Sequence, residues 1–211
     1  MGHLDVHLWS HRPLGQILGL RIAPRTYAAL VHSIELLPDE STDRAVRRVW
    51  QSLADEGLPS QTAHRHPTNR PHLTLATAGT LTAEARTALA EALAALPLPL
   101  HLAGLLRFSG RMNVLAWAVR PDSALLELHA RVWRILRETT GDDDRPNPLL
   151  SPGRWVPHIT LGRGRGAVWP GPDGRWLPCE AGGPGALPGW WAEARSYDST
   201  SRTTAGIGPG T

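Results

Sequence analysis

Apolar and polar positions alternate along the chain in segments that predict strands and helices in turn. A β-branched and apolar run over 28–37 predicts a buried strand, and the segment from Asp39 or Ser41 to Gly57 repeats apolar residues at helical spacing. The order returns after a polar loop, as a strand over 72–78 and a helix over 82–96. Strands over 100–108 and 114–119, a helix from Asp122 or Ser123 to 140 and a strand over 156–162 follow.

The order of these elements resembles one unit used twice, and it sets the expected fold class. Helical crossovers between strands are too few for a doubly wound sheet, so an α+β fold with antiparallel sheets is expected. Residues 163–189 are rich in Gly and Pro and predict an irregular segment, while 190–197 predict a last strand. We therefore expect an N-terminal extension at 1–27, a single domain at 28–198 and a flexible C-terminal tail at 199–211.

Composition excludes several kinds of enzyme. All 22 basic residues among the 211 are arginines, so no lysine is present for a P-loop, a Schiff base or the nucleophile of an ATP-dependent nucleic-acid ligase. The net charge of +3 suits phosphate ligands without indicating a general nucleic-acid-binding coat. A single cysteine, Cys179, the lack of a signal peptide and the lack of an apolar run of ~18 residues lead us to expect a cytoplasmic protein.

Two matching pentamers carry the candidate chemistry. Residues 71–75 read Pro-His-Leu-Thr-Leu, and residues 157–161 read Pro-His-Ile-Thr-Leu. A bare His-x-Thr is expected by chance, as at His66-Pro67-Thr68 in a polar loop, but two full pentamers arise by chance in only about 10⁻⁴ of such chains. On a strand, residues i and i+2 share a face, so each His and Thr point one way and the aliphatic residues the other.

This arrangement suits the cleavage of a phosphodiester. One imidazole can take a proton from water while the other gives a proton to the leaving oxygen, and threonine hydroxyls can donate to the non-bridging oxygens. That chemistry requires no metal and no cofactor. The alternative, two core histidines on similar strands, fits a single motif better than a matched pair. Other groupings, His3, His7 and His11 or Asp142 to Asp144, lack the ligand types or spacing of a metal site.

Around these pentamers the chain resembles the 2H phosphoesterase superfamily, and within it the 2'-5' RNA ligase or RNA 2',3'-cyclic phosphodiesterase family. The resemblance covers about residues 28–162. It implies a bilobal α+β fold, with two pseudo-symmetric lobes of antiparallel sheet, helices outside and a central cleft. It also implies that His72, Thr74, His158 and Thr160 are catalytic, and that Arg163, close after the second motif, binds the phosphate.

The resemblance leaves two functional hypotheses open. The first is a metal-independent phosphodiesterase acting on 2',3'-cyclic or 2'-5' phosphodiesters of RNA ends or small nucleotides, with His158 as base and His72 as acid by resemblance only. The second is a non-catalytic module that binds RNA or a nucleotide on the same fold. In either case the expected partner is an RNA end or a nucleotide carrying a cyclic phosphate, without a membrane, bound by a monomer. Trp155 stacks on a base or packs in the core.

Overall fold

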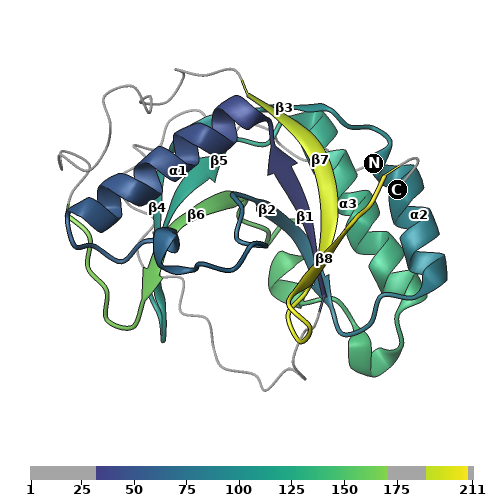
Figure 1. Cartoon of the computed structure of the whole chain (residues 1–211). Coiled ribbons are helices and arrows are strands. Elements are labelled where there is room, and N and C mark those ends of the chain that lie inside the picture. The colour runs from purple at the N-terminus through teal and green to yellow at the C-terminus, as the bar shows by residue number, and fades with distance from the viewer. Residues whose placement is uncertain (1–31, 171–188, 209–211) are drawn as a thin grey trace.

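Residues 32–170 and 189–208 are described by the computed structural model of the chain, and they form one sheet flanked by helices (Figure 1). The helices are α1 (Glu40–Asp55), α2 (Ala83–Leu93) and α3 (Ser123–Thr139), with 3₁₀ turns η2 (Gln61–Ala63), η3 (Asp142–Asp144) and η4 (Pro148–Leu150). The strands are β1 (His32–Pro38), β2 (Leu73–Ala78), β3 (Leu98–Leu100), β4 (Leu102–Phe108), β5 (Asn113–Val119), β6 (His158–Gly164), β7 (Gly189–Asp198) and β8 (Thr203–Gly206).

Side-chain caps begin all three α-helices. The carboxylate of Asp39 accepts from the Thr42 N–H at 2.9 Å, the hydroxyl of Thr82 accepts from the Ala85 N–H at 3.0 Å, and Asp122 caps α3 in the same way. These side chains satisfy backbone donors that have no partner inside the helix. Each cap is a residue at which the sequence predicts a helix start.

The sheet consists of two halves that meet at one residue pair. The strand order is β3-β7-β1-β2-β6-β5-β4, with β8 paired to β7, and every pairing in the described residues is antiparallel. Between β2 and β6, the pair that joins the halves, only Leu73 and Ile159 are in register. The chain thus has the expected α+β fold, with β3, β7, β1 and β2 in one half and β6, β5 and β4 in the other.

The helices tie the two halves together through one apolar core. Helix α1 follows the first strand in the chain, yet it contacts β6 of the other half as well as β1 and β7. Helix α3 belongs to the second half by sequence, yet it packs on β2 and on α2. Figure 1 shows α1 beside β6, and α2 and α3 side by side at the opposite end of the view. Each half therefore depends on a helix from the other.

Several sequence-based boundaries need correction. The strand expected over 100–108 is divided, since β3 pairs with β7 and only β4 pairs with β5. Part of the tail expected to be flexible forms β8 on β7, because the Asp198 carboxylate accepts from the Thr200 and Ser201 N–H groups and turns the chain back. The histidine extension at 1–27 and Cys179 lie outside the described residues. Within residues 32–170 and 189–208, no helix has the length and apolar composition that crossing a membrane requires.

Candidate active site

The two His-x-Thr motifs meet where the half-sheets join. The antiparallel pairing of Leu73 with Ile159 runs the two motifs in opposite directions, with His72 and Thr74 on either side of Leu73 and with His158 and Thr160 on either side of Ile159. The junction is therefore a local two-fold axis that exchanges the motifs. Leu73 and Ile159, at 1% and 0% exposed, point into the core, while both motif histidines are partly exposed. The alternation predicted from the sequence is confirmed.

Each motif also contains a β-bulge at its last leucine. On β2, Ala76 pairs with Ile34 and Thr74 with Glu35, so Leu75 is an extra residue; on β6, Gly162 and Thr160 pair with consecutive residues of β5, so Leu161 is extra. A bulge shifts the alternation by one residue. The residue five positions after each histidine therefore has its side chain on the motif face, which is the face of the sheet that carries the motif His and Thr side chains.

Arg163 is the residue that the second bulge returns to this face. It pairs with Val114, which shares a face of β5 with Ala116 and Ala118, the partners of Thr160 and His158. Without the bulge, an odd-numbered residue would lie on the apolar face. The exposed Arg163 side chain also lies near His64, whose pKa is lowered first by burial and then by that guanidinium. At the equivalent position of the first motif stands Thr77, which has no charge.

Both motif histidines are held in the same orientation by their own backbone. The Nδ1 atom of His72 lies 2.7 Å from the Arg70 carbonyl oxygen, and Nδ1 of His158 lies 2.7 Å from the Val156 carbonyl oxygen. A carbonyl oxygen only accepts, so each Nδ1 carries the proton and donates it. In each neutral ring Nε2 is consequently the nitrogen with a free lone pair, available to take or give a proton.

Two tryptophans brace the threonines of the motifs from the opposite half. The indole Nε1–H of Trp50 in α1 donates to the main-chain oxygen of Thr160 at 3.1 Å, and that of Trp155 donates to the main-chain oxygen of Thr74 at 2.9 Å. Trp155 stacks on the buried His129 ring, with centroids 3.9 Å apart. Of its two predicted roles, the structure therefore confirms packing.

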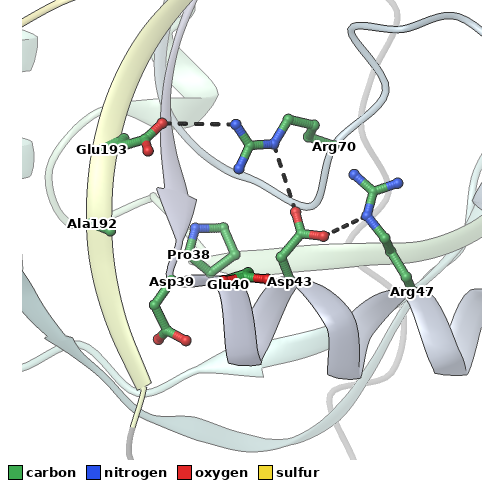
Figure 2. Close-up of a pocket in the computed structure, with 8 residues that line it drawn as sticks. All are labelled: Pro38, Asp39, Glu40, Asp43, Arg47, Arg70, Ala192 and Glu193. Atoms are coloured by element: carbon green, nitrogen blue, oxygen red, sulfur yellow. Dashed lines mark hydrogen bonds and ion pairs between the residues drawn. The ribbon is translucent and has the colours of Figure 1, made fainter.

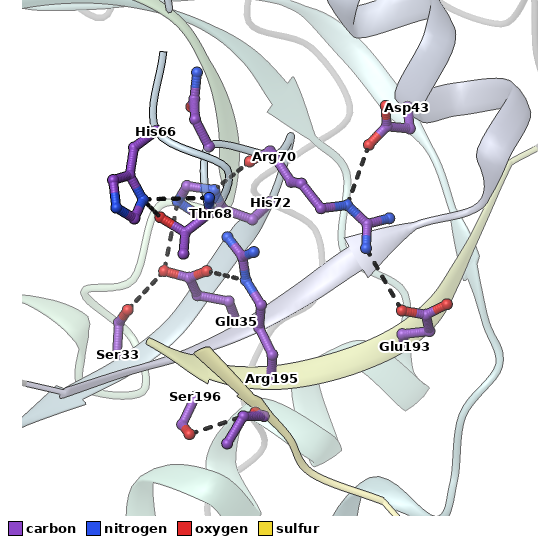
Figure 3. Close-up of polar contacts among 12 residues, drawn as sticks. Ser33, Glu35, Asp43, His66, Thr68, Arg70, His72, Glu193, Arg195 and Ser196 are labelled. Atoms are coloured by element: carbon purple, nitrogen blue, oxygen red, sulfur yellow. Dashed lines mark hydrogen bonds and ion pairs between the residues drawn. The ribbon is translucent and has the colours of Figure 1, made fainter. Parts of the chain in front are cut away.

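The surroundings of the two imidazoles break this symmetry. The Nε2 atom of His72 lies 3.8 Å from Oε1 of Glu35, a buried carboxylate that accepts from Arg195 Nε at 2.8 Å (Figure 3). The ring of His158 instead lies 4.8 Å from the ring of Phe108, between centroids. Burial lowers the pKa of His158, and the nearby His72 lowers it further, against the hydrogen bond to Val156. Burial and the neighbouring imidazole both favour the neutral form of His158.

An ion-pair network fixes the segment that precedes His72. The guanidinium of Arg70 lies between Asp43 of α1 and Glu193 of β7, with N–O distances of 3.7 Å to each, and Arg47 also pairs with Asp43 (Figure 2). These residues line a shallow surface pocket that includes neither motif histidine. Because the Arg70 carbonyl orients His72, the network supports the site from outside it.

The remaining sequence candidates lie elsewhere. His66 and Thr68 form a contact of their own in an exposed loop, with Nδ1 and Oγ1 2.8 Å apart, as expected of a chance motif. Asp142 to Asp144 form the turn η3, and Asp144 accepts from Thr80 at 2.5 Å. Over the described ranges, no three His, Cys, Asp or Glu residues are grouped as metal ligands would be. His3, His7 and His11 lie outside those ranges.

Sequence reasoning missed Glu35, Arg195 and Phe108. One signal for Glu35 was available, since it is the single charged residue within the predicted strand at 28–37. Arg195 and Phe108 carry no comparable local signal, because their partners are distant in the chain.

Comparison of the sequence with known protein families identifies the superfamily to which the chain belongs. The model of the 2'-5' RNA ligase superfamily, within the 2H phosphoesterases, matches residues 38–170, a range that includes both His-x-Thr strands. The chain belongs to this superfamily. Its members are phosphodiesterases and ligases, which places the chain among enzymes of phosphodiester chemistry at that coarse level. No curated protein sequence matched.

Solved structures of similar fold span most of the chain. A phosphoesterase superimposes with a TM-score of 0.53 at 19% identity, covering 84% of this chain and 94% of that one. Kluyveromyces marxianus Usb1 with uridine monophosphate gives 0.50 at 14% identity, over 84% and 98%. E. coli LigT complexed with NADP+ gives 0.49 at 20% identity, over 84% and 92%. At such identities the likeness concerns the fold alone.

Proposed function

We propose that the protein is a metal-independent phosphodiesterase that acts on 2',3'-cyclic or 2'-5' phosphodiesters of RNA ends or nucleotides. The observation that carries the proposal is the meeting of two identically oriented imidazoles at a local two-fold axis, each with Nδ1 on a carbonyl and Nε2 free. The nucleotide in the Usb1 structure supports a nucleotide ligand on this fold.

In the proposed reaction, a water molecule attacks phosphorus while Nε2 of His158 takes its proton. The bond from phosphorus to the ribose oxygen breaks, and Nε2–H of His72 protonates that oxygen as it leaves. A phosphomonoester and a free hydroxyl result. Thr74 and Thr160 donate to the non-bridging oxygens as negative charge develops, and Arg163 binds the phosphate. The burial that keeps His158 neutral suits the base.

The test is turnover of a panel in the presence of EDTA: 2',3'-cyclic nucleotides, RNA ending in a 2',3'-cyclic phosphate, and a 2'-5' dinucleotide. His72→Ala and His158→Ala should each lower kcat by about 10²–10⁴, the usual contribution of a positioned acid or base. The double variant should be little worse than the worse single variant, because both groups act in one proton-transfer sequence. His66→Ala is the matched control, since it removes the histidine of the chance motif.

Substrate analogues separate the two roles. A better leaving group should rescue the variant that lacks the acid, His72→Ala, and should not rescue the variant that lacks the base. If His158→Ala is rescued instead, the roles are reversed. If the wild type binds these nucleotides but turns over none of them, the alternative, a non-catalytic binding module, replaces the proposal. Loss of turnover with EDTA, restored by Zn²⁺ or Mn²⁺, would contradict the metal-independent chemistry.

A further inference from the structure

A buried carboxylate beside only one of the two motif histidines is the largest departure from the two-fold symmetry of the site. The side chain of Glu35 is 4% exposed, and three groups surround it (Figure 3). Ser33 Oγ donates to Oε1 at 2.6 Å, Arg195 Nε donates to Oε2 at 2.8 Å, and His72 Nε2 lies 3.8 Å from Oε1. A buried charge is costly unless it is paired, so these partners are what stabilise the buried carboxylate of Glu35.

The order of the strands puts these charges in a row. β1 lies between β7 and β2, and Glu35 is in register with Arg195 on one side and with Thr74 of the first motif on the other. The carboxylate consequently stands between the guanidinium and the imidazole. His72 Nε2 lies 3.8 Å from the carboxylate, and this contact favours positive charge on its ring.

The distance from Glu35 to His72 leaves the proton available. At 3.8 Å the contact is longer than a hydrogen bond, so Nε2–H is not held by the carboxylate and can still reach a leaving oxygen. Nδ1 meanwhile stays on the Arg70 carbonyl, which fixes the plane of the ring. Glu35 therefore acts on the charge of His72 without competing for its reactive proton.

No such carboxylate serves the other motif. Within the described residues His158 has no acidic partner, and its ring faces Phe108, the Val156 carbonyl and His72. We propose that Glu35 is a positioning residue that keeps His72 the protonated one of the two imidazoles, and so makes it the general acid of the reaction. The inference rests on the proposed function and adds to it a structural cause for the division of roles.

Other charged groups around His72 are few. Arg195 is ion-paired with Glu35, and Arg70 is ion-paired with Asp43 and Glu193. The two motif imidazoles repel each other when both are protonated. His66, in the loop before β2, has its Nδ1 on Thr68. Glu35 is thus the carboxylate that the structure places beside the ring.

The experiment is the pH profile of kcat/KM for wild type and Glu35→Gln. The amide keeps the shape of the side chain and removes its charge, so the basic limb should move down by about one pH unit, with a loss of about tenfold at pH 7.5 and little change at pH 5.5. Glu91→Gln is the matched control. It removes an exposed carboxylate on α2, away from both motifs, and should leave the profile unchanged.

A second variant separates catalysis from folding. Losing one partner of a buried ion pair destabilises a protein, so Glu35→Gln is combined with Arg195→Met, which leaves no uncompensated charge. The double variant should recover stability in thermal unfolding. If Glu35→Gln keeps the wild-type far-UV circular dichroism spectrum and lowers activity equally at every pH, Glu35 is structural and the inference fails.

An NMR titration keeps this inference separate from the proposed function. The midpoint of the His72 ring titration should be lower in Glu35→Gln than in wild type, whether or not any substrate is turned over. An unchanged midpoint overturns the role of Glu35. Absence of turnover with a shifted midpoint overturns the proposed reaction instead.

Discussion

The indole of Trp50 offers a test of how α1 of one half supports strand β6 of the other. Trp50→Phe removes the N–H that donates to the Thr160 carbonyl at 3.1 Å. Trp191→Phe makes the same chemical change at a site where the buried indole Nε1 has no hydrogen-bond partner among the described residues. The two side chains are 3% and 0% exposed, so they are matched in burial.

The structure predicts different costs for the two substitutions. Both lose apolar contact and leave a small cavity, a shared cost of about 2 kcal/mol. Trp50→Phe also leaves the Thr160 carbonyl without its donor, which adds about 1–3 kcal/mol. Trp191→Phe removes a donor that is unsatisfied in the folded state, which offsets part of the shared cost. Trp50→Phe should therefore be the less stable variant by at least about 1 kcal/mol.

Urea unfolding followed by far-UV circular dichroism measures the difference, provided that both variants keep the wild-type m-value. Turnover adds an independent readout, since a shifted Thr160 should lower kcat in Trp50→Phe but not in Trp191→Phe. If Trp191→Phe is as destabilised as Trp50→Phe, the indole–carbonyl bond does not contribute as argued. If stability differs but kcat does not, the bond supports the fold without positioning the threonine.

Two further predictions concern charge. Under the proposed role of Arg163 in binding the phosphate alike in ground and transition states, Arg163→Ala should raise KM more than it lowers kcat. Steady-state kinetics check this, with the exposed Arg165→Ala as control. Burial lowers the pKa of His129, so below about pH 6.5 the unfolded chain binds more protons than the folded one and the free energy of unfolding should fall as the pH drops. Urea unfolding at several pH values measures this decline, which should be smaller in His129→Phe. An equal decline in the variant would contradict the contribution of His129.

The helices and strands were predictable where residues close together in the sequence determine them. The alternation of His and Thr with aliphatic residues predicts strands with one polar face and one apolar face. The capping residues predict where α1, α2 and α3 begin. Such signals lie within a few residues of one another, where propensity and periodicity act.

The bulges and the distant pairs were not predictable in this way. Strict alternation places the side chains of Arg163 and Thr160 on different faces of the sheet. Only the bulge in the register between β5 and β6 brings Arg163 back to the face of the motif His and Thr residues. Glu35 and Arg195 are 160 positions apart, and neither carries a mark of the other. The position of β7 between β3 and β1 is likewise a matter of tertiary packing, since nothing in its own residues specifies its neighbours.

The place of β7 in the sheet has a consequence for synthesis of the chain. β1 is made early, and its free edge stays without a partner until residues 189–198 have left the ribosome, because β7 occupies that edge. The same strand carries the only guanidinium paired with Glu35 among the described residues, so the carboxylate beside His72 has no counter-charge during most of translation. A nascent chain that already contains both His-x-Thr motifs therefore still lacks the strand that pairs with β1 and neutralises Glu35.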